Sequence, residues 1–375
     1  MSGLSVQAPR AVVLIRPHRF QPNPHTREDN GFQGHDERST SSQIAAAAYA
    51  EATCLAEGLT QAGVRVHLFE DATESTPDSV FPNNWFSTHS GGRVAVYPMY
   101  SPSRQRERRA DVVEMLKAEY RVQEVIDYSG LERDGIYLEG TGAMVVDHID
   151  RVVYAARSKR TNEVALERFC AHFNYEPLLF DAVDSFGRPI YHTNVLMCIG
   201  TEFAMIGLSA ITDPSRRAHV RRRVEETGRT IIDLTPAQVR EFAGNAIELT
   251  GSSGRLLAIS SRAMKALNPS QLSIIEASAT LLATDVPTIE LAGGSVRCMI
   301  AGVHLARRDP RPADITLPSL GGAPNRQIGP LPPCEKGDGH DRGLLDVSRR
   351  AVLMPVSEPG ASPGADPSCR SSRPG

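Results

Sequence analysis

Short apolar segments alternate with longer amphipathic segments along most of the chain. Residues 12–15 form an aliphatic run that predicts a strand. Residues 41–61 are rich in alanine with helical spacing and stop before Gly63, a residue typical of a helix C-terminus. Residues 64–69 then alternate between apolar and polar positions, which predicts a second strand. The chain therefore begins as strand, helix and strand.

The same alternation continues to about residue 305. The further helices that we expect cover residues 103–119, 163–173, 215–226, 235–242 and 269–282. The further strands that we expect cover residues 93–97, 122–126, 136–138, 143–146, 152–155, 176–180, 193–199, 202–206, 231–234, 247–250, 256–260, 288–290 and 295–301. Repeated units of short strands with one helix predict a fold of mixed α/β layers rather than a doubly wound sheet.

The composition changes near the C-terminus. Residues 307–375 hold 12 of the 26 prolines and end in a stretch of Ser, Pro, Gly and Arg. Apart from a weak helical pattern at 344–353, their hydrophobic positions show little periodicity. Such a segment buries too little apolar surface to offset the entropy lost on ordering. We therefore expect one folded catalytic domain at 1–306 and a disordered tail at 307–375.

Charge, hydropathy and cysteine spacing limit the partners and the environment. The 41 basic and 44 acidic residues give a net charge of -3, which argues against nucleic acid as a partner. No apolar run approaches the length that crosses a bilayer, so no membrane partner is expected, and no export signal is visible. The six cysteines lack paired spacing, which argues against disulfides and structural zinc. These features predict a cytoplasmic protein with reduced thiols.

Cys298 has a local context that suits a nucleophile. It follows the segment Gly293-Gly294-Ser295, where backbone amides can approach a ligand closely, and the neighbouring Arg297 would favour a thiolate. A thiolate also needs a basic partner in space. By local sequence alone, however, a small apolar side chain on a buried strand is the commoner role for such a cysteine.

One histidine and two acids are candidate site residues, although their neighbouring residues do not single them out. His192 immediately precedes an apolar strand, where an imidazole can act as general acid or base near neutral pH. Glu139 follows an expected strand and precedes glycines, and Asp78 follows a proline. A core histidine, a solvated turn glutamate and an Asx-turn aspartate are equally open. Three other histidines have comparable contexts: His18, His89 and His148.

Taken together, these segments resemble the guanidine-modifying enzyme superfamily, which includes arginine deiminases, dimethylarginine dimethylaminohydrolases and glycine amidinotransferases. Residues 81–89 (FPNNWFSTH) and 294–300 (GSVRCMI) look characteristic of its citrulline-utilisation hydrolase branch. The resemblance extends from about residue 12 to residue 305. It implies the pentein fold, a five-bladed α/β propeller, and a small amino-acid substrate.

The resemblance also implies roles for single residues. Cys298 falls at the nucleophile of the superfamily, His192 at its catalytic histidine, Glu139 at the acid of a Glu-Gly-Gly-Asp pattern, and Asp78 at a substrate-binding acid. Two arginines fall in segments that hold the amino-acid end of the substrate, namely Arg104 and Arg160. A guanidinium suits this task because it forms two parallel hydrogen bonds with a carboxylate.

The departures from the pattern of the superfamily indicate a different charge on the substrate. Relatives that act on a cationic guanidinium carry carboxylates where this sequence has Asn84 and Asn194, and the last Asp of the Glu-Gly-Gly-Asp pattern is Gly142. A buried carboxylate beside a neutral ligand is costly, whereas an amide still offers hydrogen bonds. This implies a neutral ureido substrate such as citrulline, cleaved to ornithine, carbon dioxide and ammonia through a covalent intermediate on Cys298. No metal or organic cofactor is expected.

Two alternatives remain open at this point. The first keeps the fold and changes the substrate to a guanidinium, as in arginine deiminases, dimethylargininases or amidinotransferases. The second is a non-catalytic binding protein, because ribosome anti-association factors share the propeller. Assembly into a homo-oligomer is also left open.

Overall fold

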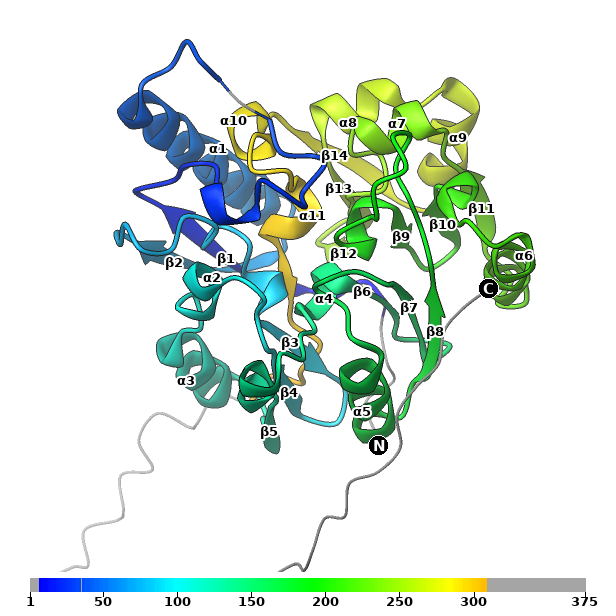
Figure 1. The fold of residues 1–375 in the computed structure, drawn as a ribbon, viewed down its shortest axis with the longest axis horizontal. Helices are drawn as coiled ribbons and strands as arrows, with labels where there is room; N and C mark the ends of the chain where they lie inside the picture. The colour runs from blue at the N-terminus through cyan, green and yellow to red at the C-terminus, as the bar shows by residue number, and fades with distance from the viewer. Residues whose placement is uncertain (1–6, 35, 309–375) are drawn as a thin grey trace, which may run out of the picture. The chain divides into compact units, whose positions relative to one another are not determined.

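The strands of the protein form five small sheets. A computed structural model describes residues 7–34 and 36–308, and in this part of the chain fifteen strands form five three-stranded sheets (Figure 1). The expectation of mixed α/β layers is therefore confirmed. The expected disordered tail falls almost wholly on residues 309–375, which lie outside the described residues.

The elements follow one another in a regular order. The strands are β1 (Ala11–Pro17), β2 (Arg65–Asp71), β3 (Phe86–His89), β4 (Arg93–Val96), β5 (Glu124–Asp127), β6 (Met144–Asp147), β7 (Val152–Ala156), β8 (Glu176–Phe180), β9 (Met197–Ile199), β10 (Phe203–Ile206), β11 (Thr230–Asp233), β12 (Ile247–Gly251), β13 (Gly254–Ser260), β14 (Thr280–Thr284) and β15 (Ala301–Gly302). The α-helices are α1 (Ser41–Gln61), α2 (Pro102–Gln105), α3 (Ala110–Glu119), α4 (Gly140–Ala143), α5 (Glu163–Phe173), α6 (Pro214–Glu225), α7 (Pro236–Arg240), α8 (Ser261–Ala266), α9 (Pro269–Glu276), α10 (Pro287–Glu290) and α11 (Val296–Met299). The 3-10 helices are η1 (Pro24–Thr26), η2 (Pro82–Asn84), η3 (Ser129–Asp134), η4 (Thr193–Val195) and η5 (Leu208–Ala210).

All five sheets share one plan. Their strand orders are β15-β1-β2, β3-β4-β5, β6-β7-β8, β9-β10-β11 and β12-β13-β14. In each sheet the middle strand pairs antiparallel with the first strand and parallel with the third. A parallel pair requires a crossover, and in every sheet this crossover contains helix. We call the antiparallel partners β3, β6, β9, β12 and β15 the inner strands.

The first sheet joins the two ends of the described chain. Val12 and Val13 of β1 pair with Gly302 and Ala301 of β15 on one side, while the whole of β1 pairs with β2 on the other. Backbone contacts continue beyond the expected domain boundary at 306, since the amide of Arg308 donates to the carbonyl of Glu119 at 2.9 Å. Closing the sheet in this way fixes the segment just before β15 against the N-terminal strand.

Helix α1 shows how local sequence sets these units. Thr40 caps its N-terminus in a reciprocal pair with Gln43, and Gly63 follows its end with a φ of 85°. The buried side chains of the helix recur at helical spacing: Ala48, Ala52, Leu55, Ala56 and Leu59. Through this face α1 packs on β1 and β2. The helix predicted over residues 41–61 is confirmed.

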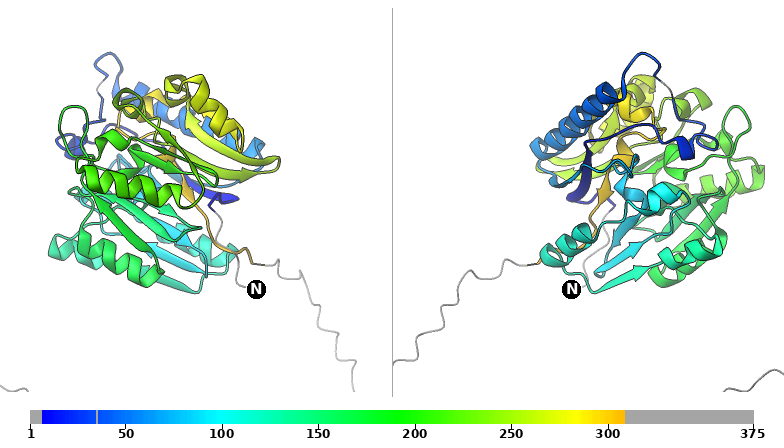
Figure 2. Two further views of the ribbon diagram at one scale, coloured as in Figure 1. Left: turned by 90° about the vertical axis from the view of Figure 1, so that its right-hand side faces the viewer. Right: turned by 60° about the vertical axis from the view of Figure 1, so that its left-hand side comes forward.

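The helices lie outside the sheets that they connect. Helices α1, α5, α6 and α9 contact β1, β8, β11 and β14 respectively and lie at the periphery in both sets of views (Figures 1 and 2). The inner strands of neighbouring sheets contact one another, β15 with β3, β6 with β9, and β9 with β12. The loops that precede these inner strands are therefore brought together.

Two of the expected helices were wrong in extent. The helix expected over residues 103–119 is divided into α2 and α3, because Glu107 between them turns inward to bind Arg104. The helix expected over residues 269–282 ends with α9, and Thr280 begins β14, which pairs in parallel with β13. In the second case a tertiary contact, the pairing with β13, overrides helical spacing.

Several expected strands were also wrong. Residues 288–290 and 295–301 lie mostly in α10 and α11, because Pro287 starts one turn and the side chain of Asn245 binds the backbone at the start of the other. Residues 136–138 make only an isolated bridge, and β3 was not expected. The segment around Cys298 is thus a helical turn rather than a strand.

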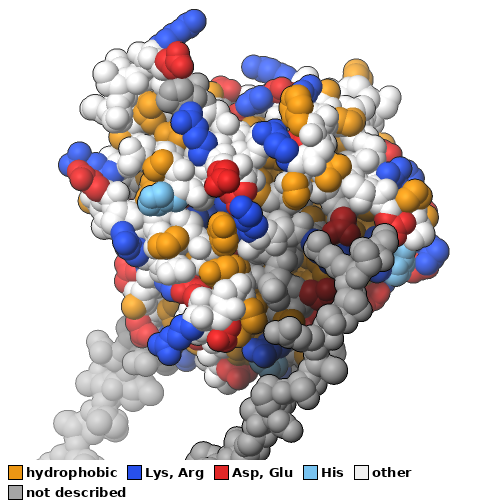
Figure 3. Space-filling view, viewed as in Figure 1, with side chains coloured by type: hydrophobic (Ala, Val, Ile, Leu, Met, Phe, Trp, Pro, Cys, Tyr) orange, Lys and Arg blue, Asp and Glu red, His pale blue; other side chains and the backbone are white. Residues whose placement is uncertain are grey.

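The described surface carries mixed charge. Figure 3 shows Lys and Arg side chains interspersed with Asp and Glu on the face it presents, in keeping with the small net charge. Within residues 7–34 and 36–308, every helix is too short or too polar to cross a membrane.

A buried histidine provides a test of the packing. His89, 2% exposed, is hydrogen-bonded through both ring nitrogens, to Ser87 at 2.6 Å and to Tyr175 at 3.2 Å, and burial holds its pKa well below the usual value. Its neutral form therefore stabilises the fold above pH 6.5, and this contribution is lost as pH falls. Between pH 7 and 5 wild type should lose about 2 kcal/mol more unfolding free energy than His89→Gln in urea titrations.

An exposed histidine supplies the control for this comparison. His25→Gln should show the pH dependence of wild type, because His25 is exposed to solvent. Equal losses in wild type and His89→Gln would contradict the buried neutral imidazole.

Candidate functional site

The candidate residues lie at equivalent places in the five sheets. A short turn or helix precedes each inner strand, and each of these turns supplies polar side chains to one region. The residues are Asn84 before β3, Glu139 and Gly142 before β6, His192 and Asn194 before β9, Asn245 before β12, and Cys298 before β15. Residues that are far apart in the sequence are thus brought together by the repeated plan.

The sulfur of Cys298 is held between two carboxamides. The Nδ2 atoms of Asn194 and Asn245 lie 3.4 and 3.2 Å from Sγ, and Cys298 is only 2% exposed. Asn245 Oδ1 also accepts a hydrogen bond from the amide of Ser295 at 3.1 Å. An N–H donor can hydrogen-bond a thiolate, and Asn194 Oδ1, 3.6 Å from Sγ, can accept from the thiol, so the two carboxamides suit either form of the sulfur.

His192 and Glu139 form a buried pair. His192 Nε2 lies 2.8 Å from Glu139 Oε2, and both side chains are almost fully buried. Burial lowers the pKa of His192 to about 4, although the hydrogen bond to Glu139 opposes that change. Burial disfavours the charge of Glu139, but the hydrogen bond with His192 and two nearby arginines lower its pKa to about 2. At neutral pH the pair is a neutral imidazole and a carboxylate.

Both predicted arginines lie beside this carboxylate. Arg104 Nη1 is 3.5 Å and Arg160 Nε is 3.6 Å from Glu139 Oε2, while the backbone amide of Tyr100 donates to Oε1 at 2.9 Å. Glu139 therefore joins His192 to both cations. Its two oxygens hold groups from three separate segments of the chain, around residues 100–104, 160 and 192.

Arg104 is fully engaged by other protein groups. It binds both carboxylate oxygens of Glu107 and lies 3.8 Å from Asp78. With the carboxamide of Asn84 oriented to suit its neighbours, the oxygen of that amide accepts from Arg104 at 2.8 and 3.0 Å. Burial raises the pKa of Glu107 to about 8 and also raises that of Asp78, although Arg104 opposes both shifts. Glu107 was not selected from the sequence.

Arg160 has a more accessible partner. Its two Nη atoms bind the carboxylate of Asp29 at 3.1 and 2.8 Å, and its guanidinium lies over the rings of Tyr100 and Tyr191. The Asp29 side chain is 18% exposed, whereas that of Glu107 is completely buried. Of the two arginines, Arg160 is the one whose carboxylate partner an external ligand can replace.

These side chains surround a small cavity of about 20 Å³. We call it the site cavity. Of the residues predicted from the sequence, six line it: Asp78, Asn84, Arg104, Arg160, His192 and Cys298. Thr26 and Asn30, which were not predicted, line it from the segment after β1. Glu139 and Asn194 are bonded to lining residues instead of lining the cavity themselves. Thus the structure brings all eight predicted residues into one neighbourhood.

Gly142 is required by the packing around the imidazole. A Cβ at this position would lie 2.1 Å from the carboxamide of Asn84 and 2.8 Å from His192 Nδ1. Among the described residues, nothing forms a hydrogen bond to that buried nitrogen. The aspartate that the resemblance would place here could not be accommodated without a shift of Asn84 or His192.

Asn245 was missed because nothing in its local sequence marks it. It lies in a segment of small and apolar residues, 242–247 (FAGNAI), and it is completely buried. Its equivalence to Asn84 and Asn194, each just before an inner strand, would have identified it had the repeat been recognised. The described residues contain no cluster of three His, Cys, Asp or Glu that suits a metal ion.

Comparison with known proteins gives one family match. Residues 16–305 match the sequence model of a family described as N,N dimethylarginine dimethylhydrolase, eukaryotic. A search of curated proteins finds no significant match.

Solved structures resemble the fold at low sequence identity. ArgZ, an arginine dihydrolase from cyanobacteria, gives a TM-score of 0.60 at 16% identity over 78% of this chain, which spans only 40% of ArgZ. The N-terminal domain of ArgZ alone is covered to 99%. AgrE with ornithine and NAD+ gives 0.61 at 18% identity, covering 80% of this chain and 40% of AgrE. The dimethylargininase of Pseudomonas aeruginosa with citrulline gives 0.54 at 13% identity, covering 78% and 99% of the respective chains.

Removing one carboxamide tests the environment of the sulfur. Asn245→Ala should slow alkylation of Cys298 by iodoacetamide at neutral pH about tenfold, since a hydrogen bond to a charged group contributes roughly 1.5–3 kcal/mol. Peptide mass spectrometry would follow the label, with the exposed Cys54 as internal reference. Unchanged labelling of Cys298 relative to Cys54 would contradict the role of Asn245.

Adding one methyl group tests the packing around His192. Gly142→Ala should lower kcat at least tenfold and cost about 1–3 kcal/mol of unfolding free energy, because the new Cβ displaces Asn84 or the imidazole. Gly130→Ala is the matched control, since a Cβ there meets no atom within 4 Å. Similar kcat values for the two variants would show that the site has room at Gly142.

Proposed function

The chain belongs to the N,N-dimethylarginine dimethylhydrolase family, and from this premise we propose that it is a cysteine hydrolase of small arginine-like amino acids. Its reaction is cleavage of a carbon–nitrogen bond. The substrate that fits the site best carries a neutral ureido group, as citrulline does. The surroundings of Cys298 carry this proposal, because the two polar side chains on its sulfur are carboxamides rather than carboxylates.

The five sheets are the blades of an α/β propeller under the same proposal. Two features support it, the strand plan that all five sheets share and the contacts between neighbouring inner strands. The similarity to the ArgZ and dimethylargininase structures agrees with it. In a propeller the loops before the inner strands converge at one end of the axis, where the site cavity lies.

Chemistry begins at the sulfur. His192 removes the thiol proton of Cys298 as the sulfur attacks the ureido carbon, and passes that proton to the amine of ornithine, which leaves. A carbamoyl thioester remains on the enzyme. The imidazole, neutral again, takes a proton from water, which hydrolyses the thioester to carbamate and so gives carbon dioxide and ammonia, and the proton returns to the sulfur. Glu139 holds the imidazole and stabilises its protonated form within each step.

Arg160 anchors the amino-acid end of the substrate. The α-carboxylate takes the place that Asp29 occupies beside its guanidinium, so that one two-bonded ion pair replaces another. Arg104 contributes positive charge but remains bound to Glu107 and Asn84. This division refines the expectation that both arginines bind the substrate in the same way.

A guanidinium substrate is the second candidate. The carboxyl group of Asp78 lines the cavity and could pair with a cation, and the similar ArgZ structure is that of an arginine dihydrolase. Burial raises the pKa of Asp78, however, and its carboxylate already accepts a hydrogen bond from Asn23 at 2.8 Å and lies 3.8 Å from Arg104. The choice between the candidates depends on the charge of the ligand.

Parallel assays distinguish these substrates. With citrulline, arginine and dimethylarginine under identical conditions, citrulline should give the highest kcat/KM and yield ornithine and ammonia. Cys298→Ser should lose this activity. Faster turnover of arginine would support the second candidate, and inertness towards all three would support a non-catalytic binding protein.

The imidazole is tested separately from binding. His192→Ala should lower kcat about 10²–10⁴-fold, the usual contribution of general acid–base catalysis, while citrulline binding measured by calorimetry persists. Exposed His25→Gln serves as control and should keep the kcat of wild type. Full activity of His192→Ala would remove the histidine from the mechanism.

A further inference from the structure

A second cavity lies among the inner strands, apart from the site cavity. It is a small cavity of about 50 Å³, and we call it the inner cavity. Its walls include residues from all five inner strands: Thr88, Val146, Cys198, Glu248 and Gly302. Helix α11 separates the two cavities, because Cys298 lines the site cavity and its neighbour Arg297 lines the inner one.

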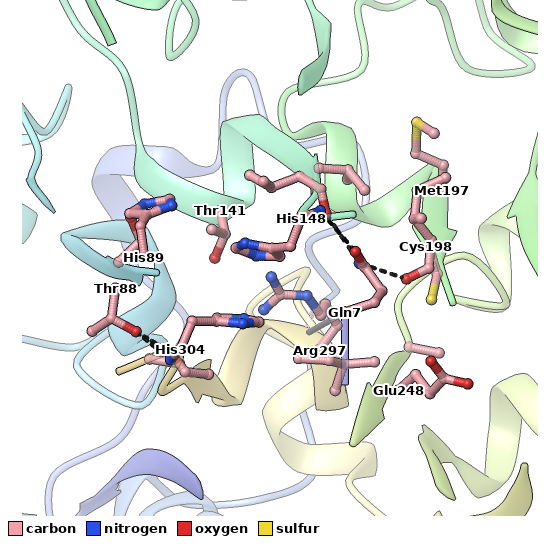
Figure 4. A pocket seen from close by; sticks show the side chains of 18 of the residues that line it. Gln7, Thr88, His89, Thr141, His148, Met197, Cys198, Glu248, Arg297 and His304 are labelled. Atoms are coloured by element: carbon pink, nitrogen blue, oxygen red, sulfur yellow. Dashed lines mark hydrogen bonds between the residues drawn. The ribbon is translucent and has the colours of Figure 1, made fainter. Parts of the chain in front are cut away.

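Arg297 places a cation in this cavity without a carboxylate partner. Figure 4 shows its guanidinium in the middle of the cavity, and its Nη1 donates to the carbonyl of Ile300 at 2.9 Å. Across residues 7–34 and 36–308, no carboxylate lies within 4.0 Å of the Arg297 guanidinium. Arg297 is half-buried, and a cation partly removed from water without a counter-charge is costly.

The carboxylate that lines the cavity is already engaged. Glu248 Oε2 accepts from the backbone and hydroxyl of Thr201 at 2.7 and 2.5 Å, and Oε1 lies 3.5 Å from Arg255 Nε. Burial raises the pKa of the Cys198 thiol to about 12, so that thiol stays neutral. Neither group supplies the charge that Arg297 lacks.

Aromatic nitrogen groups lie beside the guanidinium. The rings of His148 and His304 stack with centroids 3.7 Å apart, and both are close to Arg297 in Figure 4. His148 directs Nδ1 to the hydroxyl of Tyr175 at 3.2 Å, so its Nε2 remains for a ligand. The inner cavity thus combines the planar guanidinium of Arg297 with a further hydrogen-bonding atom, Nε2 of His148.

We propose that the inner cavity binds a small oxyanion through Arg297 and His148. The ligand is a phosphate, a sulfate or the carboxylate of a short organic acid, since the guanidinium fork matches two oxygens of each. Binding would place a negative charge beside Arg297, the residue that immediately precedes Cys298 in the sequence. The oxyanion therefore disfavours the thiolate and slows its alkylation, which makes the cavity a site that modulates the proposed nucleophile.

Calorimetry in a buffer free of other oxyanions tests the proposal. Phosphate, sulfate and acetate are titrated separately into wild type, Arg297→Gln, His148→Gln and Arg160→Gln. At least one anion should bind wild type with one-to-one stoichiometry and bind Arg297→Gln at least tenfold more weakly. Arg160→Gln should keep this binding, which separates the inner cavity from the site cavity. Loss in Arg160→Gln with retention in Arg297→Gln would overturn the proposal.

A crystallographic measurement keeps the test independent of how the variants fold. Crystals of wild type soaked in selenate, a sulfate analogue, should show an anomalous peak within hydrogen-bond distance of the Arg297 guanidinium. Cys298 alkylation should slow when the same anion is added, while labelling of exposed Cys54 stays constant. A peak only beside Arg160, or none, would refute the inner site without affecting the proposed hydrolase activity.

Discussion

The buried carboxylate of Glu139 is the constraint on which the site depends. Its exposure is 0%, so its charge must be compensated within the protein, and His192, Arg104, Arg160 and the amide of Tyr100 all contribute. These partners come from separate units of the fold. The need to satisfy one buried anion therefore fixes the imidazole, both cations and the walls of the cavity in a single arrangement.

The repeated sheet plan explains why such a site can be built from distant segments. Each inner strand is preceded by a turn whose side chains enter the same region, and closure of the first sheet by β15 adds the turn that carries Cys298. Side chains from different turns divide the work. Two carboxamides, Asn194 and Asn245, face the sulfur, while the acid and the imidazole pair with each other. The side chains that contact the sulfur of Cys298, which attacks the ureido carbon, are thus neutral.

Sequence patterns predicted what is local and missed what is tertiary. Residues 41–61 and 163–173 form the expected helices because spacing and capping residues determine them. Residues 295–301 were expected as a strand, but contacts with Asn245 from another unit bend them into a turn. The eight predicted site residues came from resemblance to a family, not from spacing. Glu107 and Asn245 have no local signal, since only their buried partners reveal them.

The proposed function depends on a covalent bond that forms between Cys298 and the carbon of a neutral ureido group. The most direct measurement is mass spectrometry of enzyme quenched in acid during turnover of citrulline carrying a ¹³C label at the ureido carbon. The account predicts a labelled carbamoyl group on the peptide that contains Cys298, without the ornithine part of the substrate. A label on another residue, or an adduct that forms with arginine but never with citrulline, would contradict it.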